Sequence, residues 1–280
     1  MTGPTLAVRA PASSANLGAG FDVLGMALGL PADVGVGEPP EDAQALDDQH
    51  PARAAFEALG GDGPLWLRSP IPMARGLGFS GAVRVAAAAL GALSVGRDVD
   101  EARPDVLDVA TGLEGHGDNA AASVYGGVVA HLGDRVLPLR LGPRLSGATV
   151  VAWVPDVTTS TDRSRRTLPD TVPRPAAVFN LGRVIQLTLA IERDDPALLA
   201  GATDDRLHQD TRLPLVEGAE EALRRGHARG AWCGWLSGSG PTVALLCDPV
   251  RAADVAATLP GGGHVKQLAV DTVGVRRIEG

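Results

Sequence analysis

The sequence predicts an α+β protein built from two lobes, and three observations lead to this prediction. In the first half, an alanine-rich segment at residues 80–93 follows a glycine-rich loop and is typical of a buried helix. In the second half, apolar segments follow one another in the order β-α-β-β-α-β once one extra helical segment is set aside. A charged stretch with proline and glycine at residues 141–147 separates the halves. We therefore expect lobes at residues 1–146 and 147–280.

The first half is expected to begin with an edge strand at residues 6–9, ahead of a loop of small residues. The clearest helix is that of residues 80–93, because its body has no breaker before Gly91. Pro104 is expected near the start of a further helix, since proline suits the first helical turn. The other expected elements are helices at 52–59 and 104–113 and strands at 65–67 and 126–132.

In the second half, Val178, Leu181, Ile185 and Leu189 recur at helical spacing and mark one face of a helix. The remaining segments give the alternating order described above. They are expected strands at 150–154, 231–236, 243–247 and 265–270, and expected helices at 217–229 and 251–259.

Composition excludes several classes of function. A hydrophobic fraction of 45% predicts a packed core, and a net charge of −8 argues against a nucleic-acid partner. Lys266 is the only lysine, so the chain has no lysine-containing phosphate loop. Any bound phosphate must then be neutralised by Mg²⁺, by arginine and by backbone amides.

Cysteine spacing and hydropathy indicate the compartment. Cys233 and Cys247 lie in apolar runs without the spacing of a metal or redox motif, so we expect both to be buried and structural. The chain shows no basic region followed by an apolar core and no apolar stretch of membrane-spanning length. We therefore expect a cytoplasmic protein without a membrane partner.

A glycine-rich loop at residues 70–82 joins an apolar run to the alanine-rich helix. Gly76, Gly78 and Gly81 allow the backbone to approach a ligand, and the first helical turn presents unpaired N–H groups that favour phosphate. Ser80 could cap this helix or reach a metal. A tight turn that needs glycine for geometry alone explains the loop equally well. Two further small-residue segments, at 13–22 and 237–242, favour convergence on one ligand.

The three segments, in this order, resemble the GHMP small-molecule kinases and most closely the homoserine kinase family. Residues 14–22 match the motif SANLGxGFD, and residues 72–80 match PxxxGLGSS in part. Residues 114–119 match EGHPDN at all but one position, and residues 237–242 match SGSGPT throughout. The resemblance covers most of the chain.

The resemblance implies ATP-dependent, Mg²⁺-requiring phosphorylation of the L-homoserine hydroxyl to O-phospho-L-homoserine, a step of threonine biosynthesis. It also implies an N-terminal ribosomal-S5-like α/β lobe and a C-terminal ferredoxin-like lobe. A homodimer is the habit of the family.

An amino-acid substrate needs an anion for its ammonium group and a cation for its carboxylate. Asp118 and Asp22 could supply the first, and Arg165 and Arg212 could supply the second through bidentate hydrogen bonds. The amide of Asn16 could recognise a polar end as both donor and acceptor. The substrate-binding residues that the resemblance implies are Asn16, Asp22, Asp118, Arg165, Arg212 and Gly238.

At the phosphates, Glu114 and Ser80 are the expected Mg²⁺ ligands, since this ion takes one or two protein oxygens beside phosphate and water. Asn119 and Arg165 are the expected catalytic residues. Because asparagine cannot accept a proton, we expect Asn119 to orient the hydroxyl while the proton leaves to phosphate or water. The expected nucleotide-binding residues are Pro72, Arg75, Gly76, Leu77, Gly78, Ser80 and Gly81.

The chain departs from the family motifs at four positions. Phe79 and Gly81 stand where the phosphate loop usually has small hydroxyl or alanine residues, and Gly117 replaces a proline. Asp210 adds a carboxylate near the expected substrate, and the segment before the phosphate loop is short. Two alternatives therefore stay open: a GHMP kinase for another small hydroxylated acid, and a kinase-derived protein that binds an amino acid without transferring phosphate.

Overall fold

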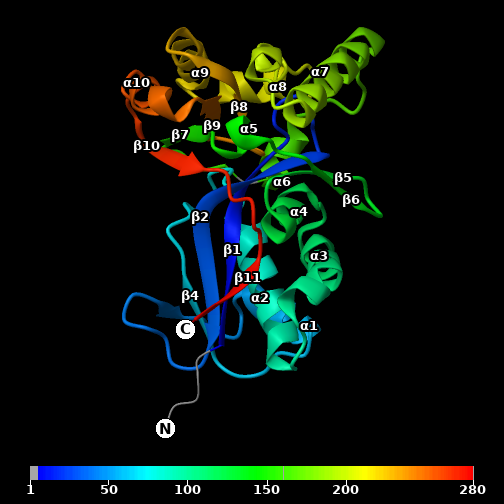
Figure 1. The fold of residues 1–280 in the computed structure, drawn as a ribbon, viewed down its shortest axis with the longest axis vertical. Coiled ribbons are helices and arrows are strands. Elements are labelled where there is room, and N and C mark those ends of the chain that lie inside the picture. The colour runs from blue at the N-terminus through cyan, green and yellow to red at the C-terminus, as the bar shows by residue number, and fades with distance from the viewer. Residues whose placement is uncertain (1–5, 160, 280) are drawn as a thin grey trace.

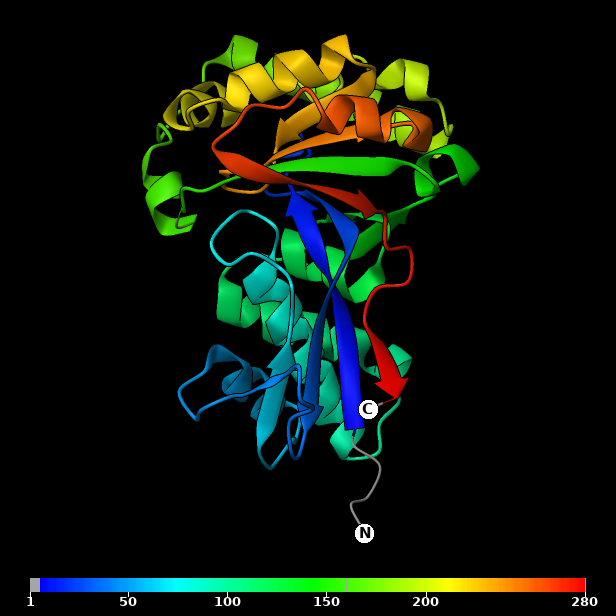
Figure 2. The ribbon, with the colours of Figure 1, turned by 90° about the vertical axis from the view of Figure 1, so that its left-hand side faces the viewer.

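The computed structural model describes residues 6–159 and 161–279, which form two lobes stacked end to end (Figure 1). The first lobe contains long strands with helices on one face. The second contains a four-stranded sheet that lies across the ends of those strands, with its helices on the outer side (Figure 2). At the junction, strand ends and loops of the first lobe thus meet the inner face of the second sheet.

The first lobe has a seven-stranded sheet whose main path runs β11-β1-β2-β4-β3, with β5 joining β2 to β6. Helices α2 and α4 pack on this sheet, and α1 and α3 pack on α2. Its elements are β1 (Leu6–Ala15), β2 (Leu24–Val36), β3 (Gln44–Ala45), α1 (Pro51–Ala58), β4 (Leu65–Arg68), α2 (Phe79–Ser94), α3 (Val99–Glu114), α4 (Asp118–Tyr125), β5 (Val128–His131), β6 (Val136–Leu139) and β11 (Arg276–Glu279).

The second lobe has an antiparallel sheet in the order β10-β7-β9-β8. Numbered within the lobe this order is fourth, first, third, second, which is the arrangement expected of a split βαβ unit. Its elements are α5 (Pro143–Ser146), β7 (Thr149–Pro155), α6 (Thr161–Arg166), α7 (Arg174–Glu192), α8 (Gln209–Arg212), α9 (Ala219–Ala228), β8 (Ala231–Leu236), β9 (Val243–Cys247), α10 (Ala252–Ala256), β10 (Gly263–Ala269) and the 3₁₀ turns η1 (Pro196–Leu199), η2 (Leu213–Leu215) and η3 (Pro249–Arg251).

The predicted α+β class and the alternating order of the second half are confirmed. The division at residues 146 and 147 stays a prediction, but the chain returns at its end, because β11 pairs with β1 in the sheet of the first lobe. This pairing also corrects the expected edge position of residues 6–9, which lie between β11 and β2. The strand continues to Ala15, so part of the expected loop is sheet.

Two helices of the first lobe differ from expectation. Helix α3 begins at Val99, capped by the side chain of Asp98, and Pro104 lies inside it rather than near its start. The sequence analysis did not predict α4, which begins at Asp118. Helix α2 agrees with the expected range and runs through Gly91. A side chain at Gly91 would meet the backbone oxygen of Phe56 at 2.2 Å, so this glycine permits close packing of α1 on α2.

The apolar face predicted for α7 exists, but it points outward. Val178, Leu181 and Ile185 are about three-fifths exposed, and the helix buries Leu187, Ala190 and Ile191 instead. The two cysteines are buried and free, as predicted, and burial raises the pKa of the Cys233 thiol to about 12. Within the described ranges, no helix has the length and apolar character needed to span a membrane.

Candidate active site

Two adjoining cavities lie at the junction of the lobes. The larger, which we call the loop cavity, has a volume of about 660 Å³ and is lined by residues 72 and 74–81 together with the end of α3. The smaller, the inner cavity, has a volume of only about 30 Å³ and lies beside Asp22, Asp118 and Arg212. The cavities adjoin, since both are lined by His116, Asn119, Arg165, Gly238 and Ser239.

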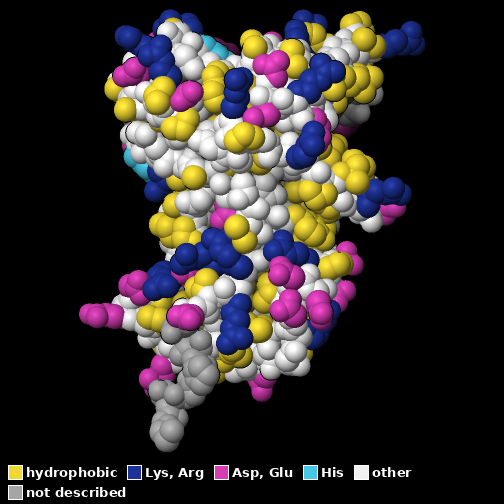
Figure 3. All heavy atoms as spheres, viewed as in Figure 1, with side chains coloured by type: hydrophobic (Ala, Val, Ile, Leu, Met, Phe, Trp, Pro, Cys, Tyr) yellow, Lys and Arg dark blue, Asp and Glu magenta, His cyan; other side chains and the backbone are white. Residues whose placement is uncertain are grey.

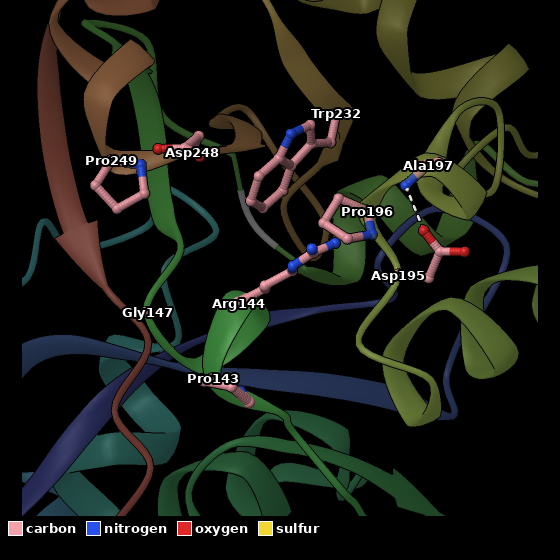
Figure 4. Close-up of a pocket in the computed structure, with 9 residues that line it drawn as sticks. All are labelled: Pro143, Arg144, Gly147, Asp195, Pro196, Ala197, Trp232, Asp248 and Pro249. Atoms are coloured by element: carbon pink, nitrogen blue, oxygen red, sulfur yellow. Dashed lines mark hydrogen bonds between the residues drawn. The ribbon is translucent and has the colours of Figure 1, made fainter.

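A separate hollow of about 540 Å³ lies in the second lobe beside Trp232 (Figure 4). The two carboxylates in its lining already accept hydrogen bonds from backbone N–H groups, because Asp195 caps η1 and Asp248 caps η3. The side chain of Arg144 extends toward Trp232 across this hollow. It contains none of the residues expected to bind substrate or nucleotide, so the junction is the better candidate.

A chain of hydrogen bonds joins both lobes to the glycine loop. The indole N–H of Trp235 donates to Ser14 at 2.8 Å, and Ser14 and Ser237 share a bond of 2.7 Å. Ser237 in turn donates to the carbonyl of Gly76 at 2.5 Å. Because the first donor and the last acceptor have fixed roles, every hydroxyl in the chain points toward the loop. The loop is therefore positioned by strand residues of both lobes.

Close packing explains two of the loop glycines. Gly76 and Gly78 have φ values of +72° and +67°, which favour glycine. A side chain at Gly76 would meet the carbonyl oxygen of Ser237 at 2.3 Å, and one at Gly78 would meet the hydroxyl of Ser13 at 2.1 Å. The tight-turn interpretation is thus sufficient for these glycines, and their contact with phosphate stays a prediction.

The first turn of α2 opens into the loop cavity. Its N-cap is Gly78, which supplies no side-chain acceptor, so of the two roles left open for Ser80 the capping role is excluded. Ser80 lies within the first turn, and its hydroxyl accepts a hydrogen bond from Arg84 one turn later. The same nitrogen of Arg84 forms an ion pair with Glu114. The N-terminus of α2 suits an anion. The oxygens of Ser80 and Glu114 suit a cation.

Ser80 and Glu114 fit the magnesium ion that the resemblance implies. Both oxygens already contact a single cationic nitrogen, so one metal ion could reach both. Within the described part of the chain, no cluster of three or more His, Cys, Asp or Glu side chains could hold a metal alone. A metal here would need further oxygens from phosphate and water, as Mg²⁺ in nucleotide sites does.

Helix α4 places Asp118 and Asn119 between the two cavities. Asp118 is 2% exposed and accepts from the backbone N–H of Asn119 at 2.8 Å and from His116 Nδ1 at 2.9 Å. Its hydrogen bond raises the pKa of His116 above the ordinary value. The side-chain carbonyl of Asn119 accepts a hydrogen bond from the hydroxyl of Ser13. The NH₂ group of Asn119 can therefore donate toward a ligand. A side chain at Gly117 would meet the ring of His131 at 2.4 Å, so His131 fills the place of the proline in the family motif.

Asp22 and Arg165 close the inner cavity from opposite lobes. The guanidinium donates two hydrogen bonds, of 2.7 and 2.9 Å, to the carboxylate. Asn16 joins the loops beside them, since it donates to Gly238 at 2.8 Å and accepts from the N–H of Asp22 at 3.0 Å. Two residues expected to bind opposite ends of a substrate therefore neutralise each other.

Arg212 is a buried cation with no carboxylate partner among the described residues. It is 4% exposed, lies over the ring of Phe21 and donates to His208 Nδ1 at 3.4 Å, while its Nε has no partner there. Burial, aided by the charge of Arg165, lowers the pKa of Arg212 to about 10, so it stays charged at neutral pH. His208 is neutral, because burial lowers its pKa, and its Nε2 donates to the carbonyl of Gly18 at 3.0 Å.

The structure brings every expected residue to the junction. All the expected substrate-binding residues line the inner cavity, and all the expected nucleotide-binding and metal-binding residues line the loop cavity. Arg75 lines it too, although its guanidinium donates to the carbonyls of Pro155 and Asp156. The sequence analysis missed Ser13, Phe21 and Arg84. Each had a signal, since Ser13 and Phe21 lie in the small-residue segment 13–22 and Arg84 follows Ser80 at a spacing of one helical turn.

Comparisons with known proteins agree with this geometry. The model of the GHMP kinases N terminal domain matches residues 48–127, and that of the GHMP kinases C terminal domain matches residues 187–264. The chain is 41% identical over 260 residues to the homoserine kinase of Thermus thermophilus, and the match covers 88% of each protein. It is 38% identical over 290 residues to that of Streptomyces avermitilis, covering 95% of this chain and 93% of the relative.

Solved structures have the same fold. The homoserine kinase of Cytophaga hutchinsonii superposes with a TM-score of 0.81 at 21% identity, covering 99% of this chain and 98% of that one. A mevalonate kinase superposes with a TM-score of 0.71 at 13% identity, covering 95% and 99%. The fold, the two matched domain models and the close relatives show that this chain belongs to the GHMP kinase family.

Proposed function

We propose that this protein is a homoserine kinase, which transfers the γ-phosphoryl group of ATP to the side-chain hydroxyl of L-homoserine in threonine biosynthesis. The hydroxyl oxygen forms a bond to the γ-phosphorus, the bond to ADP breaks, and the proton leaves to phosphate or water. Relatives named homoserine kinase, 41% identical over most of both chains, support the assignment.

The observation that carries the proposal is that a buried cation, Arg212, and a buried anion, Asp118, both line the inner cavity. The buried guanidinium of Arg212 has lost hydration and gains no ion pair from the described residues. A ligand carboxylate would supply that partner, and the buried carboxylate of Asp118 would bind an ammonium group. A free amino acid carries one group of each charge for these two side chains, whereas a hydroxylated acid without nitrogen would offer Asp118 no cationic group.

Substrate entry requires the ion pair of Asp22 and Arg165 to open. The inner cavity holds space for about one water molecule, so an amino acid cannot enter while this pair is closed. Both side chains are more than a third exposed and can separate at small cost. Arg165 would then join Arg212 on the carboxylate, and Asp22 would join Asp118 on the ammonium group.

The remaining polar end of the substrate would point toward Asn119 and the loop cavity. The NH₂ group of Asn119 would donate to the hydroxyl oxygen and hold it toward the phosphate. The backbone amides at the start of α2 would hold the phosphates, with Mg²⁺ on Ser80 and Glu114 to neutralise charge. The loop keeps its glycine geometry beside Phe79, which favours a working kinase over a protein that only binds an amino acid.

The test is turnover of the purified protein with ATP and Mg²⁺ against a panel of L-homoserine, L-serine, L-threonine, mevalonate and hydroxy acids that lack nitrogen. ADP release and phosphorus NMR of the product would be followed. Phosphorylation of homoserine in clear preference to the others is the expected result. Preference for a hydroxy acid would favour the alternative of a GHMP kinase for another small hydroxylated acid. If calorimetry shows binding of homoserine without turnover, the result would favour a kinase-derived protein that binds an amino acid without transferring phosphate.

We also infer a homodimer that buries the apolar stripe of α7. Val178, Leu181, Ile185 and Leu189 are exposed together on this helix, and Figure 3 shows apolar side chains gathered over the region where α7 lies. A contiguous apolar face of this kind favours association. We expect the wild type to sediment as a dimer and Leu181→Glu to sediment as a monomer. A monomeric wild type would exclude the homodimer.

A further inference from the structure

Arg84 occupies the position that the proposed reaction gives to a metal ion. Its Nη1 contacts the hydroxyl of Ser80 and the carboxylate of Glu114, the two expected metal ligands. Its side chain is 18% exposed and lies in the wall of the loop cavity. A single charged group therefore holds both oxygens in the absence of metal.

The other cations of the loop cavity are directed elsewhere. The guanidinium of Arg75 donates to the backbone carbonyls of Met73, Pro155 and Asp156. Arg165 forms the bidentate pair with Asp22. Arg84 is thus the one arginine in the described lining of this cavity that reaches Ser80 and Glu114.

The guanidinium of Arg84 has hydrogen-bonding capacity left over. Its Nε is buried and has no partner among the described residues. A buried donor without an acceptor is costly, so the group gains when an acceptor enters the cavity. The oxygens of a phosphate are acceptors that bind guanidinium in bidentate fashion.

We propose that Arg84 is a positioning residue that competes with the divalent metal for Glu114 and turns to the phosphates when the metal arrives. This inference rests on the proposed function, since it assumes a metal-bound nucleotide in the loop cavity. One carboxylate oxygen cannot stay in direct contact with both cations, because like charges at contact distance repel. A metal that contacts both Ser80 and this oxygen of Glu114 therefore displaces Arg84, and the nucleotide supplies its new partner.

The test measures binding rather than turnover. Affinity for Mn²⁺ alone would be measured by electron paramagnetic resonance, and affinity for a non-hydrolysable ATP analogue by calorimetry in EDTA. Arg84→Met should bind Mn²⁺ about tenfold more tightly than the wild type, because the competitor is gone. It should bind the analogue in EDTA about tenfold more weakly, the change expected from one charged hydrogen bond. Arg84→Lys keeps the charge and should keep most of the competition.

Two controls distinguish the contact of Arg84 with Glu114 from a general effect of positive charge. Arg97→Met removes a cation at the opposite end of α2, where the guanidinium pairs with Asp105, and should change neither affinity. In the Glu114→Gln background, Arg84→Met should no longer tighten Mn²⁺ binding, because the shared carboxylate is absent. Mn²⁺ affinity that is unchanged or weaker in a folded Arg84→Met protein would overturn the inference.

The outcomes also separate this inference from the proposed function. A wild type that phosphorylates homoserine while Arg84→Met binds Mn²⁺ and the analogue normally would overturn only the role of Arg84. A wild type that binds the metal-nucleotide complex, shows the Arg84 effects and prefers another acceptor would overturn only the substrate assignment.

Discussion

The two ends of the cleft recognise their ligands by different means. The inner cavity is small and lined by charged side chains from both lobes, whereas the loop cavity is large and lined mainly by the backbone of a glycine loop and a helix end. At the inner end, a change of one side chain removes a charge. At the loop end, the groups that would bind phosphate are main-chain amides, which most substitutions leave in place. We therefore expect substitutions at the inner end to have the larger effects.

The largest effect is expected for Asp118→Asn. This change keeps the shape of a buried side chain and its acceptor oxygen but removes the charge that would hold the ammonium group. We expect kcat/KM for homoserine to fall by about 10³-fold, the loss of one buried charge pair of roughly 4 kcal/mol. Calorimetry should find the affinity for the ATP analogue unchanged. Equal losses in homoserine and nucleotide binding would contradict the assignment of Asp118 to the amino-acid end.

Arg212→Met should produce the next largest effect, with an informative change in stability. We expect kcat/KM to fall by about 10²-fold, because Arg165 still binds the carboxylate. Since Arg212 is buried and no acidic side chain in the described part of the chain pairs with it, its replacement by an apolar side chain should leave the free energy of unfolding equal or higher. Denaturation in urea would measure this. A clear loss of stability would show that Arg212 is a structural residue rather than a binding group.

The charge of His116 should be visible in the pH dependence of stability. Its pKa is raised by the hydrogen bond to Asp118, so protonated His116 stabilises the fold below its unfolded pKa, and this contribution disappears as pH rises through the folded value. His116→Gln should therefore cost about 1–2 kcal/mol near pH 5.5 and much less near pH 8.5. Urea denaturation at both pH values would measure the difference. A cost that is the same at both would exclude the charged pair.

The predictability of the site from sequence also differs between its two ends. The glycine loop and α2 are contiguous in the chain, so composition and periodicity were enough to predict them. The ion pair of Asp22 and Arg165 joins residues 143 positions apart, and no local pattern shows that they neutralise each other. The contact of Arg84 with Glu114 joins residues 30 positions apart, so it could not be predicted from sequence for the same reason.

The errors in the fold have similar causes. The position of residues 6–9 depends on β11, which returns from the far end of the chain. Helix α4 is only two turns long, too short for periodicity to reveal, and its N-cap is Gly117, which has no side chain to mark the start. Pro104 marks a helix start only statistically, and the side chain of Asp98 supplies the actual cap.

The smallest effect is expected for Phe79→Ser, which restores the residue of the family motif at the loop end. Phe79 is the first residue of α2, is partly buried and packs against the core. Its loss should lower the free energy of unfolding by about 1–2 kcal/mol, part of the cost of removing a fully buried ring. Affinity for the ATP analogue should change less than about threefold, because the backbone amides keep their positions. An affinity gain of tenfold or more would show that the ring obstructs the loop, and would favour the protein that binds an amino acid without transferring phosphate.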